Sequence, residues 1–160
     1  MWRKLIKVII PGPPVAMARP RVSKIGRNVK LYTPPRSKNW MNGAEQVIKK
    51  HWNNDHIDTD IPVKLKAKFI HKRPKNRYRK KDPDSRYFKT TSPDIDNLEK
   101  ILLDSIVYAG VMKDDSQVVA IESMDYYGAK NEEAHVIFEL WTYNEIHNTI
   151  KQQKKNRPDS

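Results

Sequence analysis

The alternation of apolar and polar residues along the chain predicts four β-strands. Residues 4–10 form an apolar run that ends at the prolines within residues 11–14, which cannot continue a strand ladder. Residues 63–71 alternate between apolar and basic side chains, which is typical of a strand with one buried and one exposed face. Two more strands are expected at residues 115–130 and 133–143. We predict that these two pair as a hairpin because so few residues separate them.

Helical periodicity predicts two helices between these strands. The first runs from Arg36 to about Asn53 and carries an apolar stripe of Trp40, Ala44, Val47, Ile48 and Trp52. The second runs from about Asp94 to Tyr108 and ends at Gly110, a residue suited to a C-terminal cap. The resulting element order, β-α-β-α-β-β, predicts an α/β fold.

The length of the chain predicts one domain. A chain of 160 residues can bury its own core, and we assign residues 1–145 to that domain and residues 146–160 to a basic, frayed tail. The absence of cysteine excludes disulfides and thiolate zinc sites. The apolar run near the N-terminus is too short and too interrupted for a signal peptide or a membrane span. We therefore expect a soluble, cytoplasmic protein without a membrane partner.

The distribution of charge points to a polyanionic partner. The net charge is +12, and residues 1–50 carry 12 basic residues against one acid. Residues 72–89 carry 9 basic against 2 acidic residues, whereas residues 90–145 reverse the sign with 3 against 12. Clusters of this kind suit nucleic acid, although a solvated basic surface without a partner is the alternative.

Two basic segments supply the candidate DNA contacts. Residues 72–91 lack apolar periodicity and exceed the usual length of a loop, so we expect a loop that is mobile alone and becomes ordered on DNA. The other segment is a proline-punctuated loop or ribbon that follows the first strand. The candidate DNA-binding residues are Arg19, Arg21, Lys24, Arg27, Lys72, Arg73, Lys75, Arg77, Arg79, Lys80 and Lys81.

The second helix begins with an unusual acidic pattern. Asp94 has the position of an ordinary N-cap, but Asp96 adds a second carboxylate that a cap does not need. Asp96, Lys100 and Asp104 are spaced by four and line one side of the helix, whereas its other sides are largely apolar. An apolar surround predicts a partly buried acidic row.

A second acidic pair follows this helix. Asp114 and Asp115 lie in a turn, which has a plain structural explanation, but a hairpin starting there would return them to the start of the helix. Converging carboxylates without cysteine suit Mg²⁺ or Mn²⁺. The sequence has no EF-hand and no phosphate loop of Walker type, so we expect no nucleotide cofactor. Carboxylate-held Mg²⁺ beside basic loops is the arrangement that phosphodiester hydrolysis uses.

These residues resemble a known family. The segment PDIDNLEKILLDSIVYAGVMKDDSQV, residues 93–118, is similar to the core of RusA-type Holliday junction resolvases of phage and prophage origin. Residues 11–22 and the strand VKLKAKF resemble the family's basic N-terminal loop and its second strand. The chain departs from many members at Ser92, where they have a basic residue, and at Met17, where they often have lysine.

The resemblance implies a fold, an activity and a set of site residues. It implies a small mixed four-stranded sheet with helices packed on it, and a homodimeric endonuclease that uses Mg²⁺ on branched DNA. By position, the metal ligands would be Asp94, Asp96 and Asp115, with Asp114 as a secondary acid, and Lys100 would be the catalytic lysine.

Three functions remain open at this stage. The first is resolution of four-way junctions by paired symmetric nicks, the second is non-catalytic binding of branched DNA, and the third is a less selective nuclease. We expect the dimer contact either at Leu103 and Val107 of the second helix or on the last strands near Phe138, Leu140 and Trp141. The alternative for Leu103 and Val107 is burial within one monomer.

Overall fold

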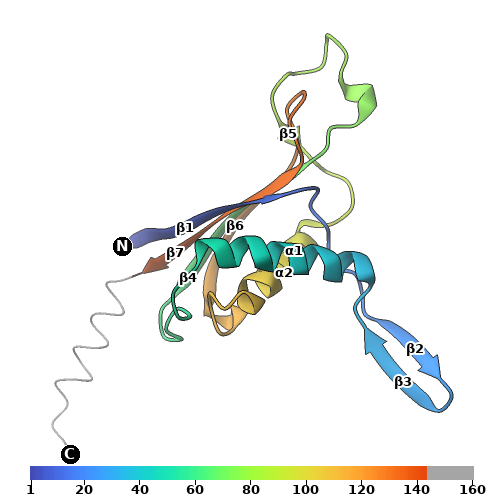
Figure 1. Ribbon diagram of the computed structural model, residues 1–160. Helices are drawn as coiled ribbons and strands as arrows, with labels where there is room; N and C mark the ends of the chain where they lie inside the picture. The colour runs from blue at the N-terminus through green and yellow to red at the C-terminus, as the bar shows by residue number, and fades with distance from the viewer. Residues whose placement is uncertain (144–160) are drawn as a thin grey trace, which may run out of the picture.

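A five-stranded mixed sheet forms the centre of the protein in a computed structural model that describes residues 1–143 (Figure 1). The expected tail, residues 146–160, lies outside the described residues. The strand order is β1-β7-β4-β6-β5, with β4 parallel to β6 and antiparallel to β7. The strands are β1 (Trp2–Pro11), β4 (Val63–His71), β5 (Tyr87–Phe88), β6 (Val118–Tyr127) and β7 (His135–Tyr143).

The α/β class is confirmed, but two details of the predicted sheet are wrong. The short strand β5 raises the number of strands in the sheet to five, and β6 and β7 do not pair because β4 lies between them. The short connection between β6 and β7 therefore crosses one strand, a distance of roughly 10 Å that a few residues span easily.

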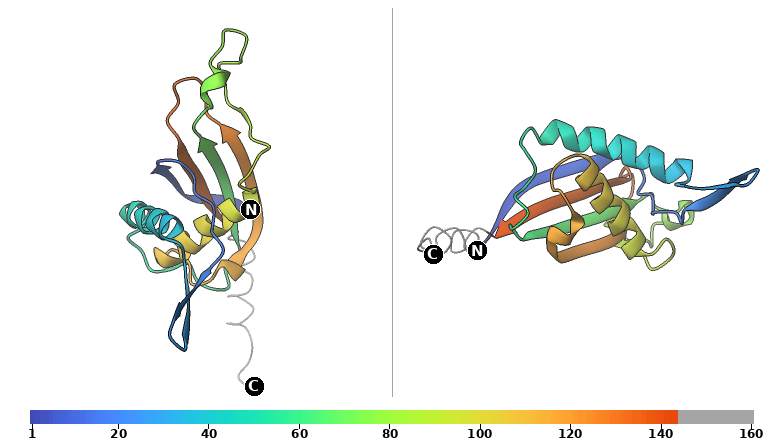
Figure 2. Two further views of the ribbon diagram at one scale, coloured as in Figure 1. Left: turned by 90° about the vertical axis from the view of Figure 1, so that its right-hand side faces the viewer. Right: turned by 90° about the horizontal axis from the view of Figure 1, so that it is seen from below.

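Two helices cover one face of this sheet (Figure 2). The helix α1 (Pro35–His51) packs its predicted stripe inward, with Ala44 and Ile48 buried. The helix α2 (Ile95–Tyr108) ends as predicted, since Gly110 has a φ of 81° and donates its N–H to the carbonyl of Val107. Within residues 1–143, no helix is both long and apolar enough to cross a membrane.

The alternation predicted for β4 is confirmed. Its apolar side chains contribute to the core under the helices, whereas its lysines lie on the other face of the sheet. There the Lys64 ammonium lies over the rings of Trp2 and Trp141, at 4.6 and 5.4 Å from the ring centroids. The core residues of the strand are Val63, Leu65, Ala67 and Phe69.

The residues expected at a dimer contact lie mostly inside one monomer. Leu103 belongs to the hydrophobic core and Val107 packs against it, so the burial alternative holds for this part of α2. Phe138 and Leu140 are fully buried as well. Leu103, Phe138 and Leu140 therefore leave little surface for a partner, whereas Val107 and Trp141 are half-buried, and Trp141 lies on the sheet face opposite the helices.

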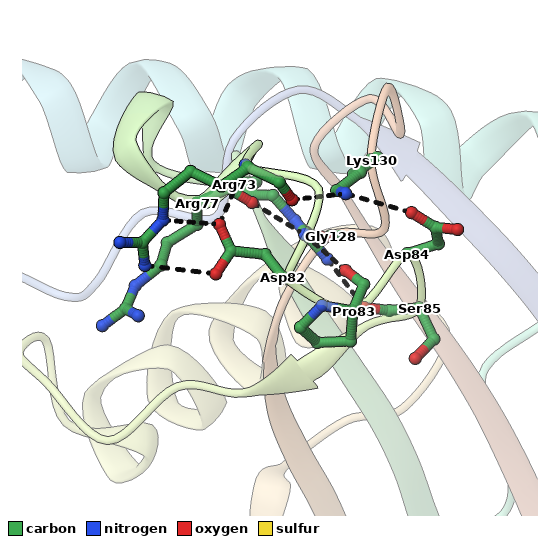
Figure 3. A network of polar contacts seen from close by, with 9 residues as sticks. Arg73, Arg77, Asp82, Pro83, Asp84, Ser85, Gly128 and Lys130 are labelled. Carbon is green, nitrogen blue, oxygen red and sulfur yellow. Dashed lines mark hydrogen bonds and ion pairs between the residues drawn. The ribbon is translucent and has the colours of Figure 1, made fainter.

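Residues 72–91 form a loop with a defined conformation, and its ordering on DNA stays a prediction. The segment contains a 3₁₀ turn, η1 (Lys75–Arg77), and the strand β5. Its centre is Arg73, which is 2% exposed and donates hydrogen bonds to carbonyl oxygens at 2.7–3.0 Å (Figure 3). The acceptors are the carbonyl oxygens of Arg77, Pro83, Ser85 and Gly128.

The basic ribbon after β1 is a two-stranded hairpin. The strands β2 (Arg21–Ile25) and β3 (Asn28–Tyr32) form a separate two-stranded sheet and project from the body of the protein (Figure 1). Gly26 begins the two-residue turn with a φ of 61°, which hairpin turns of this length require at that position.

Candidate functional site

The start of α2 leaves the Asp94 carboxylate uncommitted. Asp94 has the backbone conformation of an N-cap, but its side chain makes no capping hydrogen bond within the part of the chain that the structure describes. The ordinary cap explanation therefore does not account for it. Asp94 borders an open hollow of about 570 Å³ between residues 88–95 and the β6 residues 123–125. This hollow gives a ligand access to the first turn of α2.

Asp96 and Lys100 are exposed along the same row of α2. Asp96 lies in the first helical turn, Lys100 one turn later, and Asp104 is half-buried a further turn along. The predicted burial of this row is thus wrong for Asp96 and Lys100, because the apolar residues beside them turn into the core of the monomer. Both side chains are accessible to a large ligand such as DNA.

The acidic pair after α2 lies beside the middle of that row. Asp114 caps the 3₁₀ turn η2 (Asp115–Gln117) by accepting a hydrogen bond from the Ser116 N–H at 3.0 Å. This bond, and a shared hydrogen bond with Asp115, lower the pKa of Asp114. The same shared bond raises the pKa of Asp115, as do burial and the charges of Asp114 and Asp104, whereas Lys100 opposes the rise. Asp115 is therefore within electrostatic reach of Lys100 and Asp104.

The donor chemistry of these residues fits a hard divalent cation. All candidates are carboxylates, and the mutual repulsion of Asp114 and Asp115 is the kind that a cation relieves. Across residues 1–143, however, no three histidine, aspartate or glutamate side chains are gathered closely enough to hold an ion. The convergence that we expected from a β6–β7 hairpin is thus incomplete in this part of the chain.

A buried polar cluster supports the segment that precedes Asp94. The Lys89 ammonium donates to the Thr91 carbonyl and, at 2.8 Å, to the Ser92 carbonyl, and it lies 3.8 Å from an Asp125 carboxylate oxygen. The other oxygen of Asp125 is 2.6 Å from Nε2 of His71. Sequence analysis missed this cluster because its members come from β4, from β6 and from the loop after β5, and no local pattern links them.

Comparison with known proteins identifies the family. Residues 11–140 match the family model described as Endodeoxyribonuclease RusA. The chain belongs to the RusA family. It is also 33% identical over 127 residues to the uncharacterized protein YqaN of Bacillus subtilis strain 168, an alignment that covers 76% of this chain and 87% of that protein. The resemblance that we drew from the motif is thus confirmed, and it is that of a Holliday junction resolvase-like nuclease.

The basic residues expected to contact DNA in this RusA family member fall into two exposed groups. Arg19 lies just before the β2–β3 hairpin, and Arg21, Lys24 and Arg27 lie within it. The second group lies on the 72–81 segment, although Arg79 there is paired with Asp82 at 3.1 Å. Its members are Lys72, Lys75, Arg77, Arg79, Lys80 and Lys81.

Arg73 must be removed from this set. Its guanidinium is buried and hydrogen-bonded to backbone carbonyls, so it organises the loop and does not present charge to DNA. The remaining two groups lie toward opposite ends of the molecule, with the start of α2 between them (Figures 1 and 2).

Proposed function

We propose that the protein is a divalent-metal-dependent endonuclease that resolves four-way DNA junctions by paired symmetric nicks. The observation that carries this proposal is the exposure of Asp94, at the N-cap of α2, and of Asp96 and Lys100 within the helix. These residues lie between the two groups of exposed basic residues, one at the β2–β3 hairpin and one on the 72–81 segment. A DNA backbone that contacts both groups would pass the acidic row of α2. Cleavage of four-way junctions would serve recombination and repair of DNA in the cytoplasm.

The carboxylates would hold Mg²⁺ or Mn²⁺. Asp94, Asp96 and Asp115 are the proposed ligands, and Asp114 is the secondary acid beside Asp115. A bound divalent cation supplies positive charge that stabilises the phosphoryl transition state and eases deprotonation of water. The contribution of the chain is to hold acidic oxygens at the helix start and on the η2 turn, within reach of a bound DNA backbone.

Lys100 is the proposed cationic partner of the reacting phosphate. It is exposed one turn after Asp96, and its charge acts on Asp115. An ammonium in that position stabilises the extra negative charge that develops on the phosphate oxygens. Its charge also acts on Asp115: the hydrogen bond with Asp114 and burial raise the pKa of that carboxyl group, and the positive charge of Lys100 opposes the rise.

A homodimer would supply the two active sites for the paired cuts. A four-way junction has approximate two-fold symmetry, so a two-fold dimer presents two sites at matched positions. Of the surfaces that we expected to form the contact, we favour the sheet face opposite the two helices, around Trp141.

Cleavage of a synthetic four-way junction tests this proposal. Each strand is labelled in turn and incubated with the protein and Mg²⁺, and the products are mapped on a denaturing gel. Paired nicks at symmetric positions in two strands of like polarity support resolution. Scattered nicks, or equal cutting of linear duplex, would indicate a less selective nuclease, and tight binding without cutting would indicate a non-catalytic binding protein.

A further inference from the structure

The β2–β3 hairpin, residues 21–32, presents an aliphatic face to solvent. Val22, Val29 and Leu31 are 60%, 64% and 67% exposed. Val22 pairs with Leu31, and Lys24 pairs with Val29, so these four side chains share one face of the ribbon. Three of the four positions on that face are therefore apolar and exposed.

This aliphatic face points away from the body of the protein. Lys30 and Tyr32 lie on the opposite face of β3, because side chains alternate along a strand. Those two residues border a hollow of about 440 Å³ that is also lined by α1 and Tyr108. An isolated two-stranded hairpin is marginally stable in water, and an exposed apolar surface on one is typical of a binding site.

The base of the hairpin is attached beside the acidic row of α2. The Met17 N–H donates to the carbonyl of Asn97, the residue after Asp96, at 3.0 Å. The buried Ser37 hydroxyl of α1 donates to the Ala16 carbonyl at 3.2 Å and accepts from the Ala18 N–H at 3.1 Å. The hairpin therefore projects from a segment that is bonded to both helices, one residue from a proposed metal ligand.

The charge of the hairpin favours DNA over a second copy of the chain. It carries Arg21, Lys24, Arg27 and Lys30 and no acidic residue. Two such hairpins stacked face to face would bring eight cations together, whereas a phosphate backbone neutralises them.

We propose that this hairpin enters the branch point of the junction and covers exposed base faces there with Val22, Val29 and Leu31. This inference rests on the proposed function and explains how the protein distinguishes a junction from a duplex. Paired and stacked bases in duplex offer aliphatic side chains little surface, whereas apolar side chains can insert where stacking is interrupted. The four cations would contact the flanking phosphates and contribute equally on any DNA.

The double variant Val22→Ser, Leu31→Ser tests the proposal. Fluorescence anisotropy with a labelled four-way junction should show affinity lower by about tenfold or more. Affinity for duplex of the same length should stay within about twofold, with an unchanged salt dependence, because no charge is removed. Val119→Ser is the matched control, since Val119 is 64% exposed on β6 and should leave both affinities unchanged.

Three results would overturn the inference. One is unchanged junction affinity in the double variant, and another is an equal loss on junction and duplex, which would indicate contact with ordinary duplex grooves. The third is a drop in molar mass by light scattering, which would show that the face binds a second copy. Wild-type cleavage of the junction is measured in parallel: if it fails, the proposed function fails, whereas a cutting wild type with an unaffected double variant removes only the role of the hairpin.

Discussion

Nε of Arg73 donates a hydrogen bond to the carbonyl oxygen of Gly128, 2.9 Å away, and so joins the basic 72–81 segment to the end of β6. The other guanidinium nitrogens donate to the carbonyl oxygens of Arg77, Pro83 and Ser85. A residue that the charge pattern assigns to DNA thus acts as an internal support. The exposed lysines and arginines around it are displayed on a loop whose shape Arg73 maintains.

Replacing Arg73 should loosen this loop. We expect Arg73→Met to lower the free energy of unfolding by about 2 to 4 kcal/mol, because the carbonyl acceptors lose their buried donor. Urea unfolding measures the loss, and limited trypsin digestion should cut faster between residues 75 and 81. Lys72→Met, at an exposed neighbour, is the control. Equal stability of the two variants would contradict the supporting role.

The ion pair of Arg86 and Glu132 should make stability depend on pH. The two side chains are 2.7 Å apart, and the hydrogen bond from Arg86 lowers the pKa of Glu132 to about 2, from 4.5. The pair therefore stabilises the fold fully above pH 4.5, and this contribution is lost as the pH falls toward 2.

Glu132→Gln tests that dependence. The variant should be less stable than the wild type at pH 7, and the difference between them should shrink as urea unfolding is repeated at lower pH down to about 2. A difference that stays constant over that range would show that the charge of Glu132 is not responsible.

Lys89 should affect catalysis through the position of Asp94. Lys89→Met removes the donor to the Thr91 and Ser92 carbonyls, so the segment that leads to Asp94 loses its support. We expect the cleavage rate on bound junction to fall on the order of tenfold to a hundredfold, with little change in junction affinity. Binding of Mn²⁺, followed by electron paramagnetic resonance without DNA, should weaken in parallel. Thr90→Val is the control, and an unchanged Mn²⁺ affinity in Lys89→Met would contradict this positioning role.

The exposed cations of the 72–81 segment should set the salt dependence of binding. Replacing Lys75, Arg77, Lys80 and Lys81 by glutamine should flatten the plot of log affinity against log salt by about one unit for each lost phosphate contact. The slope is measured by anisotropy on duplex and junction. An identical slope in the variant would place this segment away from the DNA.

The sequence predicts the periodic elements of this fold well and its strand order poorly. The helix at Ile95–Tyr108 and the alternation in Val63–His71 follow from repeats within single segments. Strand neighbours are not encoded locally: β4 separates β6 from β7 because its apolar side chains are buried at the centre of the sheet, whatever the length of the turn. The short β5 has only two residues, too few to show a period.

In the candidate site, too, the sequence predicts features that follow from local spacing and misses contacts between distant segments. The acids of α2 are identified by their spacing, and Asp115 by the turn after the helix. The burial of Arg73 cannot be predicted from its neighbours, because the carbonyl of Gly128 that binds it is 55 residues away. The contact of Lys89 with Asp125 likewise cannot be predicted locally, because Lys89 directly follows β5 and Asp125 lies in β6.

Asp96→Asn provides the most direct test of the central claim, which is that the protein needs the acidic row of α2 to cleave DNA. The cleavage rate and the affinity are measured on the same labelled four-way junction with Mg²⁺, beside the control Glu99→Gln on the same helix. We predict that Asp96→Asn lowers the cleavage rate by roughly a hundredfold or more while junction affinity stays the same or rises, because a ligand and a negative charge facing phosphate are both removed. Wild-type cleavage by the folded Asp96→Asn variant would contradict the claim.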